Sequence, residues 1–498
     1  MKLKYISSIL LGSLLAFSSC DVERDPYNAI PGDKAFASVE AAGNWNNGIY
    51  SELRENSYGI FMFSTDVQAD LLNATREYGN RNGAPHRWNN AFNSGDYTIR
   101  DVWRYQYSAL KDINFMLEGF KTVPTNTESE KATMARYTAE AHFARALYFH
   151  NLVVRFAKMY DPASAAQDLG IPLLLNWDIN DKPSRSSVKE TYDQILKDLE
   201  AARAGLANVK GSPGAFRFTI EAVNALENRV RLYMQDWKGA QAIGETLIES
   251  GLYKLYTSED GVKEMWHNDK AGEDILTMTV VKPSEMPNTN NIYLGYNATK
   301  AVYTPDFVPT KRVLDLYDDT DFRKAAYFLK DKIQIQGIDY TNEYMVNKYP
   351  GNPELWTATV TNYAHKPKVF RVAEVYLNTA EAAFRNGKPD VAIKYLNAIR
   401  VARGLSGLNV SGDALMDAIK EERLRELAFE GFRLDDLRRW KEGFTRGEPQ
   451  NINFIVVAPA TEFHMIDVKA NDLKFTWGIP SNDITINPNL AGSQNEGW

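Results

Sequence analysis

The sequence predicts a mostly α-helical protein whose scaffold consists of repeated helix pairs. In segments 219–250 and 371–403, apolar residues recur at spacings of three and four, stop at a short turn and then recur again. The small residues Ala240 and Ala392 follow these turns and allow the two helices of a pair to approach closely. Segment 251–368 differs, because its short alternating apolar runs are separated by Pro, Gly and Asn. We therefore expect a helical scaffold that carries a loop-rich region.

The first twenty residues predict export and a lipid anchor. Two lysines precede an apolar run over residues 6–17, which is shorter than the ~20 residues that span a bilayer and is typical of a secretory signal peptide. Small residues then precede Cys20, the single cysteine of the chain, in a pattern that resembles a bacterial lipobox. We predict a lipoprotein signal peptide over residues 1–19 and lipid attachment at Cys20. The alternative is an ordinary signal peptide followed by a chance cysteine.

Residues 20–40 are polar and predict an extended, lipidated tether. The acidic residues Asp21, Glu23 and Asp25 resemble the surface-export signal of Bacteroidetes lipoproteins, whereas in other Gram-negative bacteria an Asp here favours retention at the inner membrane. No later segment has ~18 consecutive apolar residues. We expect a body that is lipid-anchored at the outer membrane, faces the cell exterior and does not span the bilayer.

The rest of the chain, residues 41–498, predicts a single body with four helix pairs. Helices are expected over residues 102–120, 131–160, 188–206, 219–235, 238–250, 371–385, 389–403 and 413–430. They form repeats at about 131–250 and 371–441, and the pattern resembles tetratricopeptide repeats. Such units bury their apolar faces only by stacking, and a stack presents an extended surface suited to protein partners. The loop-rich ligand region is expected at about 60–100 and 251–368.

Three motifs support a more specific interpretation. They are EERLRELAFEGFRLDDLRRW at 421–440, RVAEVYLNTAEA at 371–382, and a tail with WGIP at 477–480, NPNL at 487–490 and QNEGW at 494–498. Through these motifs the chain resembles the SusD/RagB family of Bacteroidetes outer-membrane nutrient-binding lipoproteins. The resemblance covers essentially the whole mature chain.

The resemblance implies a fold, a function and a partner. The fold would be SusD-like, with four tetratricopeptide-like helix pairs. The function would be non-enzymatic capture of oligosaccharides, or of peptides as in some members, for a SusC-like TonB-dependent transporter barrel that the protein covers as a lid. The barrel would contact mainly the helical scaffold, and the ligand would bind through loops elsewhere.

Two loop stretches have the residue types that bind sugars, which need flat aromatic faces and side chains that exchange several hydrogen bonds. Residues 73–93 contain several Asn, Arg and aromatic side chains, and residues 288–303 combine Asn with Tyr. The predicted ligand-binding residues are Tyr78, Arg81, Trp88, Asn89, Asn90, Tyr293 and Tyr296. The Arg content of the first stretch also suits anionic sugars or peptide carboxylates. The alternative is that these aromatic side chains pin the loops to the core.

The Glu/Arg-rich motif at 421–440 has a structural interpretation. Glu422 and Glu426 lie four residues apart on a helix, so they share a face, and alternating charges allow ion pairs within the helix and with its neighbours. We therefore expect this motif to lock the last repeat in place and not to bind ligand.

Composition and motifs exclude several other functions. With 57 Lys+Arg and 64 Asp+Glu the formal net charge is −7, which argues against nucleic-acid binding. The sequence lacks the common metalloprotease, hydrolase and nucleotide-binding motifs, so we predict no catalytic residue and no cofactor. The acidic cluster at 315–321 lacks the Gly and Glu of a calcium loop, so no metal ligand is predicted. A surface glycan hydrolase and a structural surface adhesin remain as alternatives, because paired catalytic carboxylates leave no reliable local motif.

Overall fold

The computed structural model describes residues 34–178, 180–457 and 463–498. The predicted signal peptide at 1–19, the predicted lipid attachment at Cys20 and most of the predicted tether at 20–40 lie outside the described residues. Within these ranges no helix is long and apolar enough to cross a bilayer.

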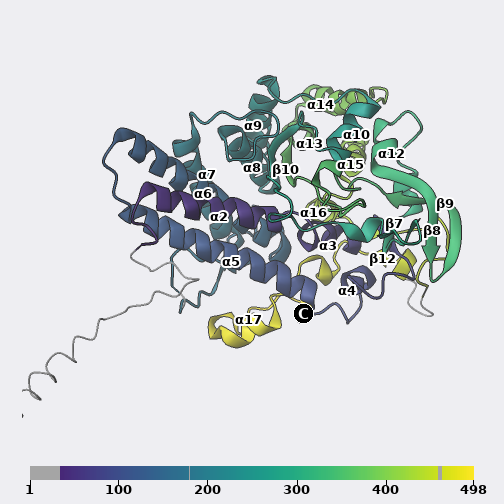
Figure 1. Cartoon of the computed structure of the whole chain (residues 1–498), viewed down its shortest axis with the longest axis horizontal. Helices are drawn as coiled ribbons and strands as arrows, with labels where there is room; N and C mark the ends of the chain where they lie inside the picture. The colour runs from purple at the N-terminus through teal and green to yellow at the C-terminus, as the bar shows by residue number, and fades with distance from the viewer. Residues whose placement is uncertain (1–33, 179, 458–462) are drawn as a thin grey trace, which may run out of the picture.

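The predicted helical scaffold is confirmed. Three helix pairs pack in sequence order: α6 (Glu128–Phe156) with α7 (Val188–Leu206), α8 (Ile220–Tyr233) with α9 (Trp237–Glu249), and α13 (Val372–Arg385) with α14 (Pro389–Ala402). α13 also packs against α9 and α15 (Asp413–Leu427), so the pairs form one stack across the left and upper parts of Figure 1. α16 (Arg433–Trp440) follows α15, and an ion pair of 2.8 Å from Arg423 Nε to Asp436 Oδ2 joins the two helices.

Local sequence signals set the ends of these helices. α6 begins with a capping box, in which the Thr127 hydroxyl accepts from the Glu130 amide at 3.2 Å and the Glu130 carboxylate accepts from the Thr127 amide at 2.9 Å. α7 begins with the same arrangement. α13 is followed by Gly387 in the left-handed region, and α14 begins at Pro389, whose fixed φ suits the first helical position.

Four helices that precede α6 in the chain add to the helical part. α2 (Val39–Glu55) and α5 (Tyr97–Gly119) pack against each other and against α6. α3 (Ile60–Gln68) and the short α4 (Gly83–Arg87) lie in the first predicted loop region. The other short helices are α10 (Glu259–His267), α11 (Lys311–Leu314), α12 (Phe322–Tyr327), α17 (Ser481–Ile486) and single 3-10 turns at Phe120–Thr122, Asn291–Tyr293, Pro353–Leu355, Phe463–Met465, Leu473–Phe475 and Pro488–Leu490.

The middle of the chain contains more strand than the sequence predicts. A four-stranded sheet has the order β5 (Tyr296–Asn297), β6 (Val302–Tyr303), β8 (Phe328–Ile335), β9 (Ile338–Val346), with only the β6–β8 pair parallel. The β8–β9 hairpin closes at Gln336 and Gly337, which both have positive φ angles as a tight two-residue turn requires. This hairpin forms the right-hand edge of the molecule in Figure 1.

Four small antiparallel pairs join distant segments. They are β1 (Leu72–Ala74) with β7 (Phe307–Pro309), β4 (Asp274–Thr277) with β10 (Lys368–Arg371), β2 (Leu169–Pro172) with β3 (Arg185–Ser187), and β11 (Phe444–Thr445) with β12 (Asp467–Val468). The β2–β3 pair lies between the two helices that the sequence predicts over 131–160 and 188–206. The β1–β7 pair joins the first predicted ligand loop to the segment that follows the second.

The structural interpretation of the Glu/Arg-rich motif is confirmed for its α15 part, residues 421–427. Glu422, Arg423 and Glu426 are fully buried and take part in an ion-pair network inside the protein. The network connects α15 to Arg323 of α12 and to Arg371 of β10. It therefore locks the last repeat to the loop-rich region.

The glycine of this motif has its own physical reason. Gly431 has a φ of 79°, and a Cβ atom there would lie 2.7 Å from the Met62 carbonyl of α3. Its amide donates to Asp66 Oδ2 at 2.9 Å. Only glycine permits this close approach, which holds α3 against the segment that leads into α16.

Candidate functional site

The structure brings the two predicted ligand loops together. Leu72 in β1 pairs with Pro309 in β7, and the Thr75 amide donates to the Asp306 carbonyl at 2.9 Å. Arg81 then forms an ion pair with Asp306, with 2.7 Å between Arg81 Nε and Asp306 Oδ2. The first stretch is therefore fixed to the chain directly after the second.

The first stretch presents phenol rings among polar groups. Arg87 Nη1 donates to the Tyr78 hydroxyl at 2.9 Å and also to the Asn80 side chain. The Tyr97 hydroxyl donates to Asn82 Oδ1 at 3.0 Å, which connects the stretch to the first turn of α5. Tyr78 is half-buried, Tyr97 is exposed, and both keep part of their rings open to solvent.

The second stretch presents a similar group on the four-stranded sheet. The Tyr296 and Tyr303 rings lie 5.0 Å apart on the paired strands β5 and β6. The Tyr363 hydroxyl accepts from the Tyr296 amide at 2.5 Å, and all three tyrosines are half-buried. We call the surface formed by Tyr78, Asn80, Arg81, Arg87, Tyr97, Tyr296 and Tyr303 the loop face.

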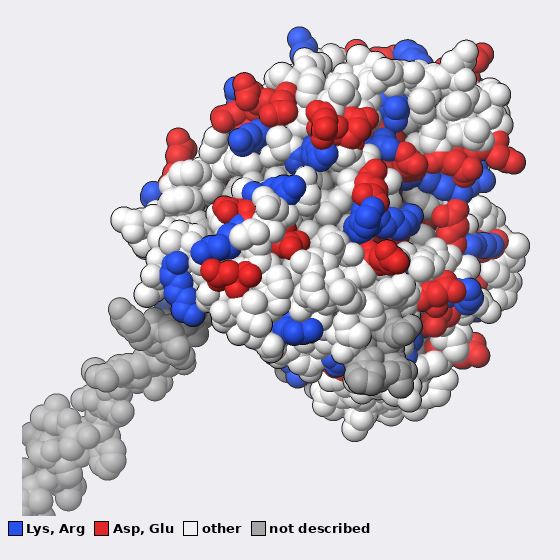
Figure 2. Space-filling view, turned by 90° about the vertical axis from the view of Figure 1, so that its right-hand side faces the viewer, with Lys and Arg blue, Asp and Glu red and all other residues white. Residues whose placement is uncertain are grey.

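Charges near the loop face are mixed. Figure 2 shows the end of the molecule that carries the β8–β9 hairpin, where acidic and basic side chains are interspersed among uncharged ones. Arg81 is paired with Asp306, and burial raises the pKa of Asp306 despite this partner. Asp306 compensates the charge of Arg81, whereas Arg87 bonds to the uncharged Tyr78 and Asn80, so the loop face offers hydrogen bonds mainly from polar groups together with one guanidinium.

The seven predicted ligand residues differ in where the structure places them. Tyr78 and Tyr296 are half-buried, whereas Arg81, Asn89 and Asn90 are exposed. Asn89 Oδ1 accepts from the Ala91 amide at 3.0 Å and so shapes its own turn. For these five residues the binding role stays a prediction, and their accessibility is consistent with it.

Trp88 and Tyr293 lie in the core, as the alternative sequence interpretation proposed for loop aromatics. Trp88 Nε1 donates to the Gln68 carbonyl at 2.6 Å, and its ring packs against Phe475 at 5.0 Å. Tyr293 packs against Tyr349 at 6.2 Å, and burial followed by the charge of Asp66 raises the pKa of Tyr293 well above its ordinary value. In this arrangement neither ring offers a free face to a ligand, so any effect of these residues on binding would act through loop position.

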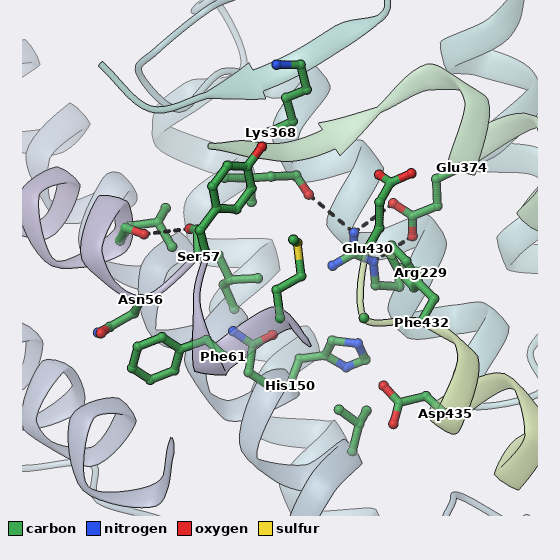
Figure 3. Close-up of a pocket in the computed structure, with 18 of the residues that line it drawn as sticks. Asn56, Ser57, Phe61, His150, Arg229, Lys368, Glu374, Glu430, Phe432 and Asp435 are labelled. Carbon is green, nitrogen blue, oxygen red and sulfur yellow. Dashed lines mark hydrogen bonds and ion pairs between the residues drawn. The ribbon is translucent and has the colours of Figure 1, made fainter. Parts of the chain in front are cut away.

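A polar cleft that the sequence analysis did not predict lies between the helical stack and the loop-rich region. It has a volume of about 140 Å³ and is lined by residues from α2, α3, α5, α6, α8, β10, α13 and α16. Figure 3 shows Ser57 and Asn56 on one side, Arg229 and Glu374 on the other, and His150 with Asp435 below. No local motif marks this cleft, because its walls come from segments that are distant in sequence.

The ionised groups of the cleft are paired. Arg229 donates from Nε and Nη2 to the two carboxylate oxygens of Glu374 at 2.6 and 2.7 Å. Arg371 Nε donates to Glu430 Oε2 at 3.0 Å. Burial alone would raise the pKa of Glu430, but Arg371 and Lys348 outweigh it and hold the pKa below its ordinary value. Glu430 is therefore ionised at neutral pH and poorly suited to act as a general acid.

Other polar atoms of the cleft have no hydrogen-bond partner among the described residues, although Arg438 Nη1 lies 3.9 Å from Asp435 Oδ1. They are His150 Nδ1, Gln106 Oε1 and Asp435 Oδ1, for which the described part of the chain provides no hydrogen bond. Burial, with Arg229 and Arg155 nearby, lowers the pKa of His150 well below its ordinary value, so the imidazole is neutral at pH 7. A neutral imidazole nitrogen can accept or donate a hydrogen bond, and the cleft therefore offers several free positions to a polar guest.

The acidic cluster of the loop region is divided among separate partners. Asp321 pairs with Arg323 at 2.8 Å, and Asp319 pairs with Lys324 at 2.6 Å. Across the ranges that the structure covers, no group of three or more His, Cys, Asp or Glu side chains is arranged to hold a metal ion.

Comparison with known proteins places this chain in one family. The family model described as the SusD family matches residues 252–498, and a second model, described as starch-binding associating with outer membrane, matches residues 23–232. The chain belongs to the SusD/RagB family.

Individual relatives are similar over nearly their whole length. SusD-like protein P25 of Formosa agariphila is 22% identical, and the match covers 98% of each chain. SusD-like protein P38 of the same organism is 23% identical over 87% of this chain and 90% of its own length.

The solved structures agree on the fold. A SusD superfamily protein from Bacteroides thetaiotaomicron superposes with a TM-score of 0.78 at 24% identity, covering 91% of this chain and 99% of the other. A SusD-like carbohydrate binding protein from Bacteroides vulgatus gives a TM-score of 0.73 at 20% identity, covering 93% and 99%. These matches confirm the predicted SusD-like, mostly α fold.

Proposed function

We propose that this protein is a cell-surface lipoprotein that captures oligosaccharides and delivers them to a SusC-like TonB-dependent transporter barrel. The observation that carries this proposal is the loop face, where the β1–β7 pair fixes the first Asn- and Tyr-rich stretch to the segment that directly follows the second. Half-exposed phenol rings supply stacking surfaces, and the neighbouring amide and guanidinium groups supply hydrogen bonds to hydroxyls. The second family model, described as starch-binding, supports a carbohydrate as the ligand class.

The helical stack supplies a separate surface for the barrel. An open, mainly apolar groove lies between α9 and the α13–α14 pair and is lined by Leu255, Tyr376 and Val401. Val401 in this groove is 61% exposed, so the groove presents apolar surface that a partner would cover. In the proposed arrangement the barrel contacts this stack, while the loop face stays free for the ligand.

The proposed anchor and location follow from the N-terminus and the family. Lipid on Cys20 would hold the body at the outer membrane, and the acidic residues after it would direct the protein to the cell exterior. The second family model, described as associating with the outer membrane, supports this location.

Binding without catalysis is the chemistry that the site supports best. The carboxylates of the cleft, Glu374, Glu430 and Asp435, each have an arginine partner. A glycosidase needs one protonated and one ionised carboxyl group that face each other across the sugar. Arg371 and Lys348 hold the pKa of Glu430 below its ordinary value, so Glu430 offers no proton to a leaving group, whereas burial raises the pKa of Asp435 despite its partner Arg155.

Calorimetry with product analysis tests the proposal. Linear neutral hexaoses of α-1,4-glucan, β-1,4-glucan, β-1,4-xylan and β-1,4-mannan, together with a peptide pool, are titrated into the protein, and the sugars are then separated by chromatography. We expect at least one hexaose to bind reversibly and to be recovered intact. Shortened products would favour the hydrolase alternative. Binding of peptides alone would replace the oligosaccharide ligand, and binding of none of these probes would favour the adhesin alternative.

A further inference from the structure

The cleft contains buried polar atoms that could form hydrogen bonds to a bound ligand. His150 on α6, Gln106 on α5 and Asp435 on α16 are only 2%, 4% and 4% exposed, yet each has an atom without a hydrogen-bond partner among the described residues. A buried polar atom left unsatisfied costs about 1–3 kcal/mol. Three such atoms from three different helices meet in one cavity, so the cavity is built to hold hydrogen-bonding material.

The size of the cleft limits that guest. A volume of about 140 Å³ is well above the ~10–15 Å³ that one enclosed water needs. It therefore admits one small polar unit and not a folded chain. The cationic groups Arg155, Arg229 and Arg371 are already paired with carboxylates, so the guest has no free cation to neutralise.

An aromatic path leads from the loop face to this cleft. Tyr97 and Tyr105 are eight residues apart and therefore lie on the same side of α5, about 12 Å apart along the helix axis. Their exposed fractions are 39% and 44%. Tyr97 belongs to the loop face, and the Tyr105 ring lies 5.9 Å from Phe61, which lines the cleft. Asp101, which is paired with Arg100 and Arg104, occupies the position between the two tyrosines on this side of α5, so the path offers polar groups as well as stacking surfaces.

We propose that the cleft is a terminal subsite that binds the end unit of a neutral oligosaccharide, while the following units lie along Tyr105 and Tyr97 toward the loop face. Hydroxyl groups of the end unit donate to Gln106 Oε1 and Asp435 Oδ1 and bond to His150 Nδ1. The apolar side of the next unit stacks on the ring of Phe61 or Tyr105. This inference rests on the proposed carbohydrate function and adds a direction to it, because the ligand then enters by one end.

A thiol reporter tests the subsite. The natural chain has one cysteine, so Cys20→Ser yields a background without thiols. Asn151→Cys places a single thiol in the cleft wall, and Ser57→Cys is a second reporter from the opposite wall if the first variant does not fold. Ala132→Cys is the matched control, since it is exposed on the same helix α6 about 28 Å away.

Labelling by N-ethylmaleimide is then measured with and without each of the four hexaoses named above. We expect a hexaose that binds in calorimetry to slow labelling at position 151 at least tenfold and to leave position 132 unchanged. Binding without any change at positions 151 and 57 would overturn the terminal subsite and leave the proposed function standing. If no hexaose binds, the carbohydrate function fails and the subsite fails with it.

Discussion

Arg403 and Glu426 form a two-bond ion pair in the interior of the protein. Arg403 Nε lies 2.9 Å from Glu426 Oε2, and Arg403 Nη2 lies 2.9 Å from Glu426 Oε1, with both side chains fully buried. Arg371 and Arg323 donate to the same carboxylate at 3.0 and 3.1 Å. One glutamate therefore bonds to three guanidinium groups that hold the last repeat against the loop-rich region, and each of them has a further carboxylate partner.

Removing this carboxylate charge is predicted to destabilise the fold strongly. Glu426→Gln leaves buried guanidinium groups without full compensation, which typically costs about 3–5 kcal/mol. Urea unfolding followed by circular dichroism measures the loss. Glu421→Gln is the control on the same helix, because that side chain is 55% exposed and pairs only with Arg425, so its loss should stay below ~1 kcal/mol. Equal effects of the two variants would contradict the role assigned to Glu426.

Replacement of Trp88 is predicted to lower the stability of the fold. Its ring is buried between Phe444 and Phe475, so Trp88→Ala should lower the free energy of unfolding by about 3–5 kcal/mol. Thermal or urea unfolding checks this expectation. The sequence alone places Trp88 on the ligand surface, where Trp88→Ala would cost little stability. A loss of unfolding free energy under ~1 kcal/mol would support that placement and contradict the buried one.

Tyr78 is predicted to act on ligand affinity. Tyr78→Ala removes a half-exposed ring and a hydroxyl of the loop face, so we expect a bound hexaose to lose about five- to tenfold in affinity, equivalent to about 1–1.4 kcal/mol. Calorimetry gives the affinity, and unfolding curves check that the fold is kept. Phe216→Ala is the matched control, since this ring is 53% exposed and lies outside the loop face. A similar loss in both variants would remove Tyr78 from the binding surface.

Asp66 is predicted to make the protein less stable as pH rises from 6.5 to 8. Burial raises the pKa of Asp66 to about 8, whereas an unfolded aspartate titrates near 3.9. Between these values the folded state holds a proton that the unfolded state has released, so raising the pH favours unfolding by up to about 1.4 kcal/mol per unit, or about 2 kcal/mol over this window.

Urea unfolding at several pH values checks this slope. Asp66→Asn keeps an acceptor for the Gly431 amide but has no proton to release, so its slope should be smaller than that of the natural protein. Glu52→Gln is a second, independent variant. Burial and the neighbouring Asp112 raise the pKa of Glu52 to about 8, so this change should also make the decrease of stability with pH less steep. An unchanged slope in Asp66→Asn would show that Asp66 is ionised in the folded state at neutral pH.

The helices were predictable because their signals are local. Ser and Thr caps, the Pro389 start and the spacing of apolar residues depend only on neighbouring sequence, and the structure has α7 at Val188–Leu206 as the sequence predicts. The β8–β9 hairpin was not predicted as one long element. Its strands carry charged residues such as Lys330, Asp331 and Lys332 on their exposed positions, which dilute the apolar alternation.

The candidate site shows where local sequence stops being informative. An aromatic residue in an Asn-rich loop fits both a ligand surface and a core anchor, and only the hydrogen bond from Trp88 to Gln68 decides between them. The cleft depends on side chains such as Gln106, His150 and Asp435, which come from three helices that meet only in the folded protein. Each of them alone fits an ordinary packed residue of a helix.

A crystal structure with a bound hexaose tests the central claim most directly. The ligand should be intact, should contact Tyr78 or Tyr296 on the loop face, and should end with one unit next to Gln106 and His150 in the cleft. The helical groove beside Val401 should remain empty, because it is proposed for the transporter. A hexaose bound only in that groove, or found cleaved, would contradict the account.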